Sequence, residues 1–262
     1  MSAAWTWTAA MPAIGVLALI AWAVCTMRRN VGLVDIFWSL FFLVAAVVYA
    51  VVSAPAGPRT ARVLVLVTAW SLRLAVYLAA RNWNAPEDHR YQTIRARNQP
   101  NFAWKSLYLV FGLQGLLAWL VSAPLAAAIA SEAPLRALDW AGALLAIFGI
   151  VFESVADGQL ARFRRDPGSD GRVLDRGLWR WSRHPNYFGE CCVWWGFYLL
   201  AVAGGGAWTV FAPLLMTLLL LRVSGVALLE KDIGERRPDY RAYVDSTSAF
   251  VPWPPRKARC AS

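Results

Sequence analysis

The stretch LVDIFWSLFFLVAAVVYAVVS, residues 33–53, holds a single charged side chain, Asp35, and decides the class of fold. A helix needs about 20 predominantly apolar residues to cross the hydrocarbon core of a bilayer. Windows of similar character lie on both sides of this one. The sequence therefore predicts an all-α polytopic membrane protein with seven transmembrane helices, at about residues 8–27, 33–53, 61–80, 106–126, 138–158, 188–204 and 207–227.

The composition of the whole chain supports this class. Hydrophobic residues make up 58% of the 262 residues, and 15 residues are tryptophan, which is more than an ordinary soluble domain carries. Gly204, Gly205 and Gly206 separate the last two windows and predict a tight helical hairpin. Gly142 and Gly149 predict that the fifth helix approaches a neighbouring helix closely.

The net charge of +10 suggests nucleic acid as a partner, but the positions of the charges favour a membrane. Of the 26 lysines and arginines, 22 follow the first, third and fifth windows or lie in the tail from Arg222, and 3 lie in the opposite loops. This is the positive-inside pattern. We expect an outward N-terminus, a cytoplasmic C-terminus, a bacterial inner membrane as the location and no nucleic-acid partner. With two histidines and four cysteines that lack ligand spacing, we expect no metal site.

Residues 179–190, WRWSRHPNYFGE, lie where a basic loop enters the sixth window. Proline at 185 suits the first turn of a helix, and Asn186 and Glu190 then fall one turn apart on one face. A helix N-terminus flanked by Arg180 and Arg183 attracts anions. The pattern predicts a site for a phosphorylated cofactor, in which His184 caps the helix or contacts an anion more readily than it acts as a base.

Four ionisable side chains lie within the predicted spans. Each costs on the order of 3 kcal/mol in hydrocarbon, so each needs a partner or a polar cavity. An ion pair between Asp35 and Arg73 is one solution, and a role in a site is the other. Glu153 and Asp157 share a helix face and repel each other, which favours hydroxyl or amide groups of a bound cofactor as their partners.

The polar loops 81–105 and 158–188 and the tail from residue 228 lie on the same predicted side of the membrane. They can therefore meet over one site. The tail reads as a short charged helix followed by an aromatic and proline-rich segment. Two interpretations remain open for it, a cap over the site or an anchor on the membrane surface.

Taken together, the acid in the second span, the arginine in the third, FESVADGQLARFRRDP (152–167), RGLWRWSRHPNYFGE (176–190) and a tail of the form Y-x8-P resemble the steroid 5-alpha-reductase family. The chain is most similar to its bacterial branch, a conserved membrane domain of unknown function. The resemblance covers most of residues 30–253. It implies a single seven-helix domain over residues 1–262 that takes NADPH from the cytoplasmic side and reduces the carbon–carbon double bond of an enone lipid, such as a 3-oxo-Δ4-steroid.

Most of the implied cofactor site falls within residues 138–253. The resemblance matches Asn186, Glu190, Asp157, Arg164 and Tyr243 to cofactor contacts, and neighbouring arginine and aromatic side chains extend the set. The predicted cofactor-binding residues are Arg81, Asn82, Glu153, Asp157, Arg164, Arg165, Arg172, Arg180, Arg183, His184, Asn186, Tyr187, Glu190, Tyr240 and Tyr243.

The implied substrate side is formed by the second and third spans. Asp35 matches a glutamate that contacts the substrate ketone, and Asp35 and Arg73 form the predicted catalytic pair. The predicted substrate-binding residues are Val34, Asp35, Trp38 and Trp70. Val34 stands where the family has glutamine and Trp70 near its tyrosine, so the match is closer on the cofactor side.

Hydride transfer to the β-carbon of an enone places negative charge on the carbonyl oxygen, which must meet a donor. A protonated Asp35 in an apolar site is one candidate donor. If Asp35 is ionised, a tyrosine or water must donate instead. The sequence leaves both open.

Two other functions compete with the reductase. A membrane S-adenosylmethionine-dependent methyltransferase of the isoprenylcysteine or phospholipid type shares the RHPxYxG block and an acidic tail that contains tyrosine. The spacing of Glu153, Asp157 and Arg164 and the number of spans favour the reductase. A transporter or scaffold would distribute ionisable residues across the membrane, whereas here they gather on one side.

Overall fold

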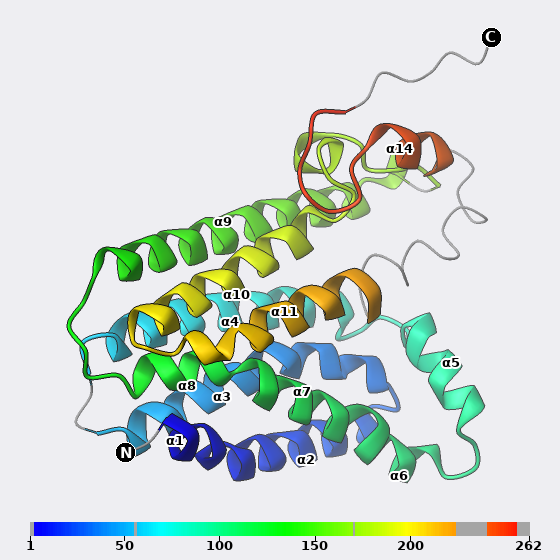
Figure 1. The fold of residues 1–262 in the computed structure, drawn as a ribbon. Coiled ribbons are helices and arrows are strands. Elements are labelled where there is room, and N and C mark those ends of the chain that lie inside the picture. The colour runs from blue at the N-terminus through cyan, green and yellow to red at the C-terminus, as the bar shows by residue number, and fades with distance from the viewer. Residues whose placement is uncertain (1–2, 55–56, 170, 224–239, 256–262) are drawn as a thin grey trace. The chain divides into compact units, whose positions relative to one another are not determined.

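The structure is a computed structural model that describes residues 3–54, 57–169, 171–223 and 240–255. All regular secondary structure in these residues is helical (Figure 1), which confirms the all-α part of the predicted fold class. The first half contains α1 (Ala3–Ala9), α2 (Met11–Met27), η1 (Val31–Leu33), α3 (Val34–Val52), α4 (Thr60–Asn82), α5 (His89–Arg97), α6 (Phe102–Ser106), the π-helical η2 (Leu107–Gly112), α7 (Leu113–Val121) and α8 (Ala123–Ile129).

The second half contains α9 (Ala137–Arg165), η3 (Pro167–Ser169), η4 (Gly177–Arg180), α10 (Pro185–Ala203), η5 (Ala207–Val210), α11 (Phe211–Leu218), the π-helical η6 (Leu219–Val223) and α14 (Tyr240–Ser246). Much of the charged segment that the sequence predicts at the start of the tail, together with residues 224–227 of the last predicted window, lies outside the described residues.

Five helices are long and apolar enough to cross a membrane, and they correspond to the first five predicted windows: Ala3–Met27, Val31–Val52, Thr60–Asn82, Phe102–Val121 and Ala137–Arg165. The fifth helix continues past the predicted end at 158. Residues 159–165 remain helical although most of their side chains are polar, so the drop in hydropathy does not mark the end of the helix. The sixth window corresponds to α10, and the seventh overlaps the shorter apolar stretch Ala207–Arg222. The integral membrane class is therefore supported by five spans.

The chain forms two compact units, Met1–Ala143 with Phe197–Ala212 and Leu144–Gly196 with Pro213–Ser262. In the first unit, α3 and α4 pack against each other around reciprocal hydrogen bonds. The hydroxyl of Ser39 donates to the carbonyl of Ser71 at 2.9 Å, and the hydroxyl of Ser71 donates to the carbonyl of Ser39 at 2.6 Å. Each polar group is thereby satisfied within an apolar interior.

The first unit also contains a buried ion pair between Arg59, which precedes α4, and Asp139, in the first turn of α9. Arg59 and Asp139 are 0% and 1% exposed, and the Arg59 Nε donates to the Asp139 Oδ1 at 2.6 Å. Further hydrogen bonds from Arg59 reach the carbonyls of Ala133 and Ala203. A buried charge needs such a complete set of partners, so this arginine joins three chain segments.

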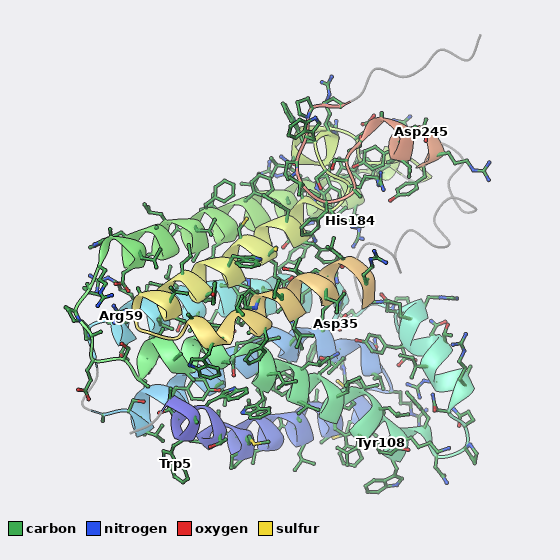
Figure 2. The ribbon with its side chains drawn as sticks, in the orientation of Figure 1. Trp5, Asp35, Arg59, Tyr108, His184 and Asp245 are labelled. Carbon is green, nitrogen blue, oxygen red and sulfur yellow. The ribbon has the colours of Figure 1, made fainter. Side chains whose placement is uncertain are left out.

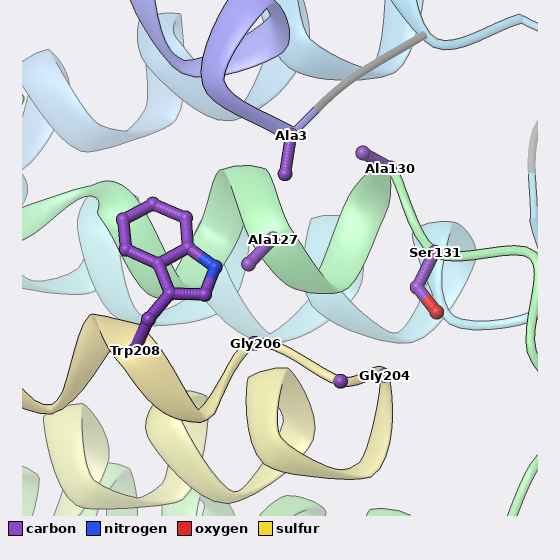
Figure 3. A pocket seen from close by; sticks show the side chains of 8 residues that line it. Ala3, Ala127, Ala130, Ser131, Gly204, Gly206 and Trp208 are labelled. Carbon is purple, nitrogen blue, oxygen red and sulfur yellow. The ribbon is translucent and has the colours of Figure 1, made fainter.

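The glycine run after α10 forms the predicted tight turn, with Gly205 at φ +89°. Beside it lies a small pocket of about 100 Å³, lined by residues that include Gly204, Gly206, Ser131 and Trp208 (Figure 3). A Cβ atom at Gly204 would lie 2.8 Å from the Cβ of Ser131. Glycine is therefore required here for close approach.

In the second unit, α9 and α10 cross with their backbones close together. A Cβ atom at Gly149 would lie 2.6 Å from the carbonyl oxygen of Gly189, and one at Gly189 would lie 2.7 Å from the backbone nitrogen of Glu153. This confirms the predicted close approach at Gly149. The crossing fixes the position of Glu153 relative to the first turns of α10.

Candidate functional site

The second unit buries a cluster of acceptor side chains where α9 faces the start of α10. Glu153 and Asp157 are 2% and 3% exposed on α9, and Glu190 is 6% exposed on α10. The Asn186 Nδ2 donates to the Asp157 Oδ1 at 3.4 Å. The structure thus brings Asp157 and Asn186 together, and it places Glu153 against Gly189, the residue before Glu190.

The Oδ1 of Asn186 is buried, and it has no hydrogen-bond donor among the described residues. A buried acceptor without a donor costs about 1–3 kcal/mol. Together with the nearby carboxylates, this oxygen makes the cluster rich in acceptors. The arrangement suits a ligand that carries hydroxyl, amide or amine donors.

The start of α10 at Pro185 places Asn186 and Glu190 in the first turns of that helix. Helix α10 begins at Pro185, as the sequence predicts, because proline in the first turn loses no helical hydrogen bond. The rings of His184 and Tyr187 are stacked with centroids 5.7 Å apart. His184 is 6% exposed, and its backbone N–H donates to the hydroxyl of Ser182. The imidazole lies at the helix entry.

The loop before α10 is fastened to the last turns of α9. Gly177 has φ +62°, and a Cβ atom there would lie 2.6 Å from the side chain of Gln159. The Gln159 Oε1 accepts from the backbone N–H of Leu178 at 2.9 Å, and the Trp179 indole donates to the carbonyl of Ala156 at 3.0 Å. Gly177 is therefore required for both its backbone conformation and its packing.

A pocket of about 330 Å³ opens beside this loop. Its lining combines two arginines, an amide, a carboxylate and apolar side chains: Gln159, Arg162, Phe163, Asp166, Leu174, Arg176 and Gly177. Sequence reasoning missed Arg162 and Arg176 as site residues. The available signal was the spacing of Gln159 and Arg162, which are three apart on α9 and so share a face.

The predicted phosphate-binding arginines fall into two groups. Those with exposed side chains lie around the loop: Arg164, Arg165, Arg172 and Arg180. Arg183 is 9% exposed instead, and its Nη1 donates to the carbonyls of Val244 at 3.0 Å and Thr247 at 2.7 Å. Arg183 therefore ties the tail to the loop, a role that its sequence position did not reveal.

The tail lies across the same loop. The Tyr243 hydroxyl donates to the carbonyl of Trp179, the Ser182 hydroxyl donates to the carbonyl of Phe250 at 2.7 Å, and the backbone N–H of Trp253 donates to the carbonyl of Trp181 at 2.9 Å. The rings of Tyr240 and Tyr243 pack edge to face. Residues 240–253 thus cover the segment that leads into α10, which agrees with the interpretation of the tail as a cap.

A second polar cluster lies in the first unit around Asp35, which is labelled in Figure 2. Asp35 is in the first turn of α3, and its Oδ2 accepts from the Arg90 Nη2 at 3.2 Å. Its Oδ1 accepts from the Tyr91 hydroxyl at 2.6 Å, and the Gln114 Nε2 donates to that hydroxyl at 3.2 Å. The described partners of Asp35 come from α5 rather than from the helix that carries Arg73.

Helix α5 is held in place by further charged contacts. Glu87 accepts from the backbone N–H of Val31 at 2.7 Å and from Arg95 at 2.7 Å. Asp88 caps α5 by accepting from the backbone N–H of Arg90 at 2.9 Å. Although burial acts to raise the pKa of the Asp88 carboxyl, the hydrogen bond and charge of Arg90 outweigh it and lower that pKa below its usual value.

The remaining predicted residues lie in the first unit. Val34 and Trp70 are fully buried, and Trp70 packs against Phe42, which in turn meets Trp38 edge to face with centroids 5.2 Å apart. The predicted substrate residues therefore border an aromatic part of the core. On α4, the Arg81 Nε donates to the Asn82 Oδ1 at 2.8 Å.

A family described as proteins of unknown function, DUF1295, matches residues 21–247. The chain belongs to this family. A Schizosaccharomyces pombe protein, described as uncharacterized, is 30% identical to this DUF1295 protein over an alignment of 271 residues that covers 90% of this chain and 77% of the yeast protein. No solved structure matches the chain.

Proposed function

We propose that this DUF1295 protein is an NADPH-dependent membrane reductase that reduces the carbon–carbon double bond of an enone lipid, as in the steroid 5-alpha-reductase family that its motifs resemble. The observation that carries the proposal is the buried acceptor cluster of Glu153, Asp157, Asn186 and Glu190. The Asn186 Oδ1, which has no donor among the described residues, calls for a donor from a ligand.

NADPH fits the chemistry of these residues. Its carboxamide, ribose hydroxyls and adenine amine are hydrogen-bond donors, which match carboxylate and amide acceptors. Its phosphates match arginines, because the guanidinium fork binds phosphate through paired hydrogen bonds. Arg162 and Arg176 line the pocket at the end of α9, the helix that also carries Glu153 and Asp157, and the exposed loop arginines extend this basic surface. NADPH would supply the hydride.

The same acceptor cluster would also suit the amine and ribose of S-adenosylmethionine, and the RHPNYFGE block keeps the methyltransferase as the alternative function. S-adenosylmethionine carries no phosphate, however. The arginines of the pocket and loop therefore favour a phosphorylated dinucleotide as the ligand. Their number also favours NADPH over NADH, whose ribose lacks the additional phosphate.

In this proposal α10 and the stretch Ala207–Arg222 form the sixth and seventh crossings, with the N-terminus outside and the C-terminus in the cytoplasm of a bacterial cell. The arginine-rich loops then face the cytoplasmic pool of NADPH. The substrate is an enone lipid taken from the bilayer, for which a 3-oxo-Δ4-steroid is the first candidate. On the substrate side we propose Asp35 and Arg73 as catalytic residues, bordered by Val34, Trp38 and Trp70.

Binding of the cofactor tests the proposal directly. We expect NADPH to raise the melting temperature of the purified protein in detergent, and NADH and S-adenosylmethionine to raise it much less. Asp157→Asn removes a buried charge that accepts hydrogen bonds, and we expect it to weaken NADPH binding about tenfold or more. Asp245→Asn makes the same chemical change at an exposed position of α14 and should leave binding unchanged.

Stabilisation by S-adenosylmethionine but not by NADPH would replace the reductase with the methyltransferase. Equal NADPH binding by the Asp157→Asn and Asp245→Asn variants would instead remove the acceptor cluster from the cofactor site.

A further inference from the structure

Three tryptophans mark one end of the first unit. Trp22, Trp83 and Trp104 each lie close to the end of a different candidate span. The rings of Trp83 and Trp104 are 44% and 66% exposed. Tryptophan is enriched where a bilayer meets water, because its amphipathic ring lies at the level of the lipid headgroups. The three rings therefore indicate the level of the headgroups at this end of the unit.

Contacts between helices hold these tryptophans in place. The Trp22 indole of α2 donates to the carbonyl of Ala103 in α6 at 2.8 Å, and its ring centroid lies 5.0 Å from that of Trp104 (Figure 1). The guanidinium of Arg28, which follows α2, lies 4.7 Å over the Trp83 ring, and its Nη2 donates to the carbonyl of Trp83 at 3.2 Å. The end of α2 therefore contacts both α6 and the residue that follows α4.

The acidic side chains around this end are already paired. The Arg90 Nη2 lies 3.2 Å from the Asp35 Oδ2, and the Arg90 Nε lies 3.0 Å from the Asp88 Oδ1. The Arg95 Nη2 lies 2.7 Å from the Glu87 Oε1. The segments 22–35 and 81–108 contain no acidic residue other than these three. Any further cation here must find its anion outside the protein.

Several cations of this end form no ion pair among the described residues. They are the exposed Arg28, Arg29 and Arg97 and the partly exposed Lys105. The guanidinium of Arg95 lies 4.8 Å over the ring of Phe102, so the last turn of α5, which ends at Arg97, is held beside the start of α6. Like charges gathered in this way repel each other unless an external anion joins them.

We propose that this end of the first unit binds the headgroup of an anionic phospholipid. The site, called the basic patch below, consists of Arg28, Arg29, Arg97, Lys105, Trp83 and Trp104. Guanidinium groups bind the oxygens of a phosphodiester through paired hydrogen bonds. The exposed indole rings would flank the glycerol and the first carbons of the acyl chains. This site is separate from the proposed cofactor site, and its occupation does not depend on reduction of an enone.

The composition of the basic patch favours an anionic lipid over other anions. A small soluble anion would satisfy the cations but leave the exposed rings of Trp83 and Trp104 in water. A zwitterionic lipid carries a positive group that the patch repels. Clusters of lysine and arginine at the ends of transmembrane helices attract anionic headgroups, and each cation strengthens binding about fivefold. A phospholipid with net negative charge matches both the cations and the rings.

Native mass spectrometry of the delipidated full chain tests this assignment. An equimolar mixture of dioleoylphosphatidylglycerol and dioleoylphosphatidylcholine offers two lipids with the same acyl chains and different headgroup charge. We expect the wild type to retain phosphatidylglycerol at least about fivefold more than phosphatidylcholine. Equal retention of the two lipids would overturn the proposal.

Arg62 offers a matched control within the same unit. Its guanidinium lies 5.0 Å over the Trp140 ring, and its Nη1 donates to the carbonyl of Pro58 at 2.9 Å, so it makes the same two kinds of contact as Arg28 outside the basic patch. We expect Arg28→Gln to lower retention of phosphatidylglycerol about fivefold. Arg62→Gln should leave it unchanged. Equal losses in the two variants would show that the basic patch is not a particular site and would overturn the proposal.

A second variant covers the case in which Arg28→Gln does not fold. The double change Arg29→Gln with Arg97→Gln alters two exposed side chains for which the described residues provide no hydrogen bond or ion pair, so the fold should persist while retention of phosphatidylglycerol falls. Unchanged retention in this variant would contradict the role of the patch. Excess inorganic phosphate should leave the bound lipid in place. Displacement by phosphate would identify a site for small anions and would also overturn the proposal.

Discussion

The contacts of Arg183 differ from those that its position in the sequence predicts. The pattern at the start of α10 predicts that Arg183 contacts a phosphate, whereas the structure points its Nη1 at two carbonyls of the tail. Asp35 behaves similarly, since its described partners Arg90 and Tyr91 lie 55 and 56 residues away. The chemistry of each side chain could be predicted here, but its partner could not, because contacts distant along the chain depend on the folded helices.

Arg183→Ala should loosen the tail. The substitution leaves the carbonyls of Val244 and Thr247 without their donor, and hydrogen bonds to charged groups contribute about 1.5–3 kcal/mol. We expect a loss of stability of about 2 kcal/mol and faster proteolytic cleavage between residues 240 and 255, measured by thermal unfolding and limited proteolysis. Arg180→Ala removes an exposed arginine of the same loop and serves as the control. Equal cleavage of the two variants would contradict the role of Arg183 in holding the tail against the loop.

The cap of α5 should depend on pH through Asp88. Its pKa is lower in the folded protein than the ordinary value of 3.8, so its contribution is complete above that value and is lost as pH falls through the folded pKa. We expect the protection factors of the α5 amides, which correct hydrogen exchange for its intrinsic dependence on pH, to be lower below about pH 3.8 than at pH 6. Asp88→Asn keeps a capping oxygen without the charge, and its exchange should lose this pH dependence. A variant that keeps the dependence would exclude Asp88 as its source.

At the scale of elements, the start of α10 at Pro185 and the close approach at Gly149 could be predicted from local chemistry. The extension of α9 to Arg165 could not be predicted from hydropathy, because a helix continues while its side chains become polar. The contact of Gly189 with the backbone of Glu153 was also missed. It depends on the crossing of two helices, which no single segment encodes.

Gly189→Ala tests this crossing. Its Cβ would lie 2.7 Å from the Glu153 backbone nitrogen, so the two helices must separate and Glu153 must move. We expect a stability loss of about 1–3 kcal/mol and weaker NADPH binding, measured by chemical unfolding and ligand-induced thermal shift. Gly158→Ala on α9 meets nothing within 4 Å and should stabilise the helix by up to about 1 kcal/mol. Similar behaviour of both variants would mean that the crossing is not tight.

For the whole molecule, hydropathy alone predicted the all-helical membrane class and the first five spans, because bilayer thickness sets helix length. The two compact units were not visible in the sequence. They recombine distant segments, since residues 197–212 belong with the first 143 residues. The ion pair of Arg59 with Asp139, 80 residues apart, illustrates why such a division depends on tertiary contacts.

The distribution of charge predicts the orientation of the molecule. With 22 basic residues assigned to one side and 3 to the other, we expect a reporter fused at the C-terminus to be cytoplasmic and one fused in the loop between α3 and α4 to be external. The measurement is the activity of an alkaline phosphatase fusion against the fluorescence of a green fluorescent protein fusion. The reverse pattern would move the arginine loops away from cytoplasmic NADPH and contradict the proposed cofactor source.

The most direct measurement of the central claim is oxidation of NADPH by the purified protein in the presence of progesterone or testosterone, with the product identified by mass spectrometry. We predict oxidation that depends on the steroid and a product heavier than the substrate by two hydrogens. A protein that binds NADPH and the enone but yields neither oxidation nor the heavier product would contradict the proposed reaction.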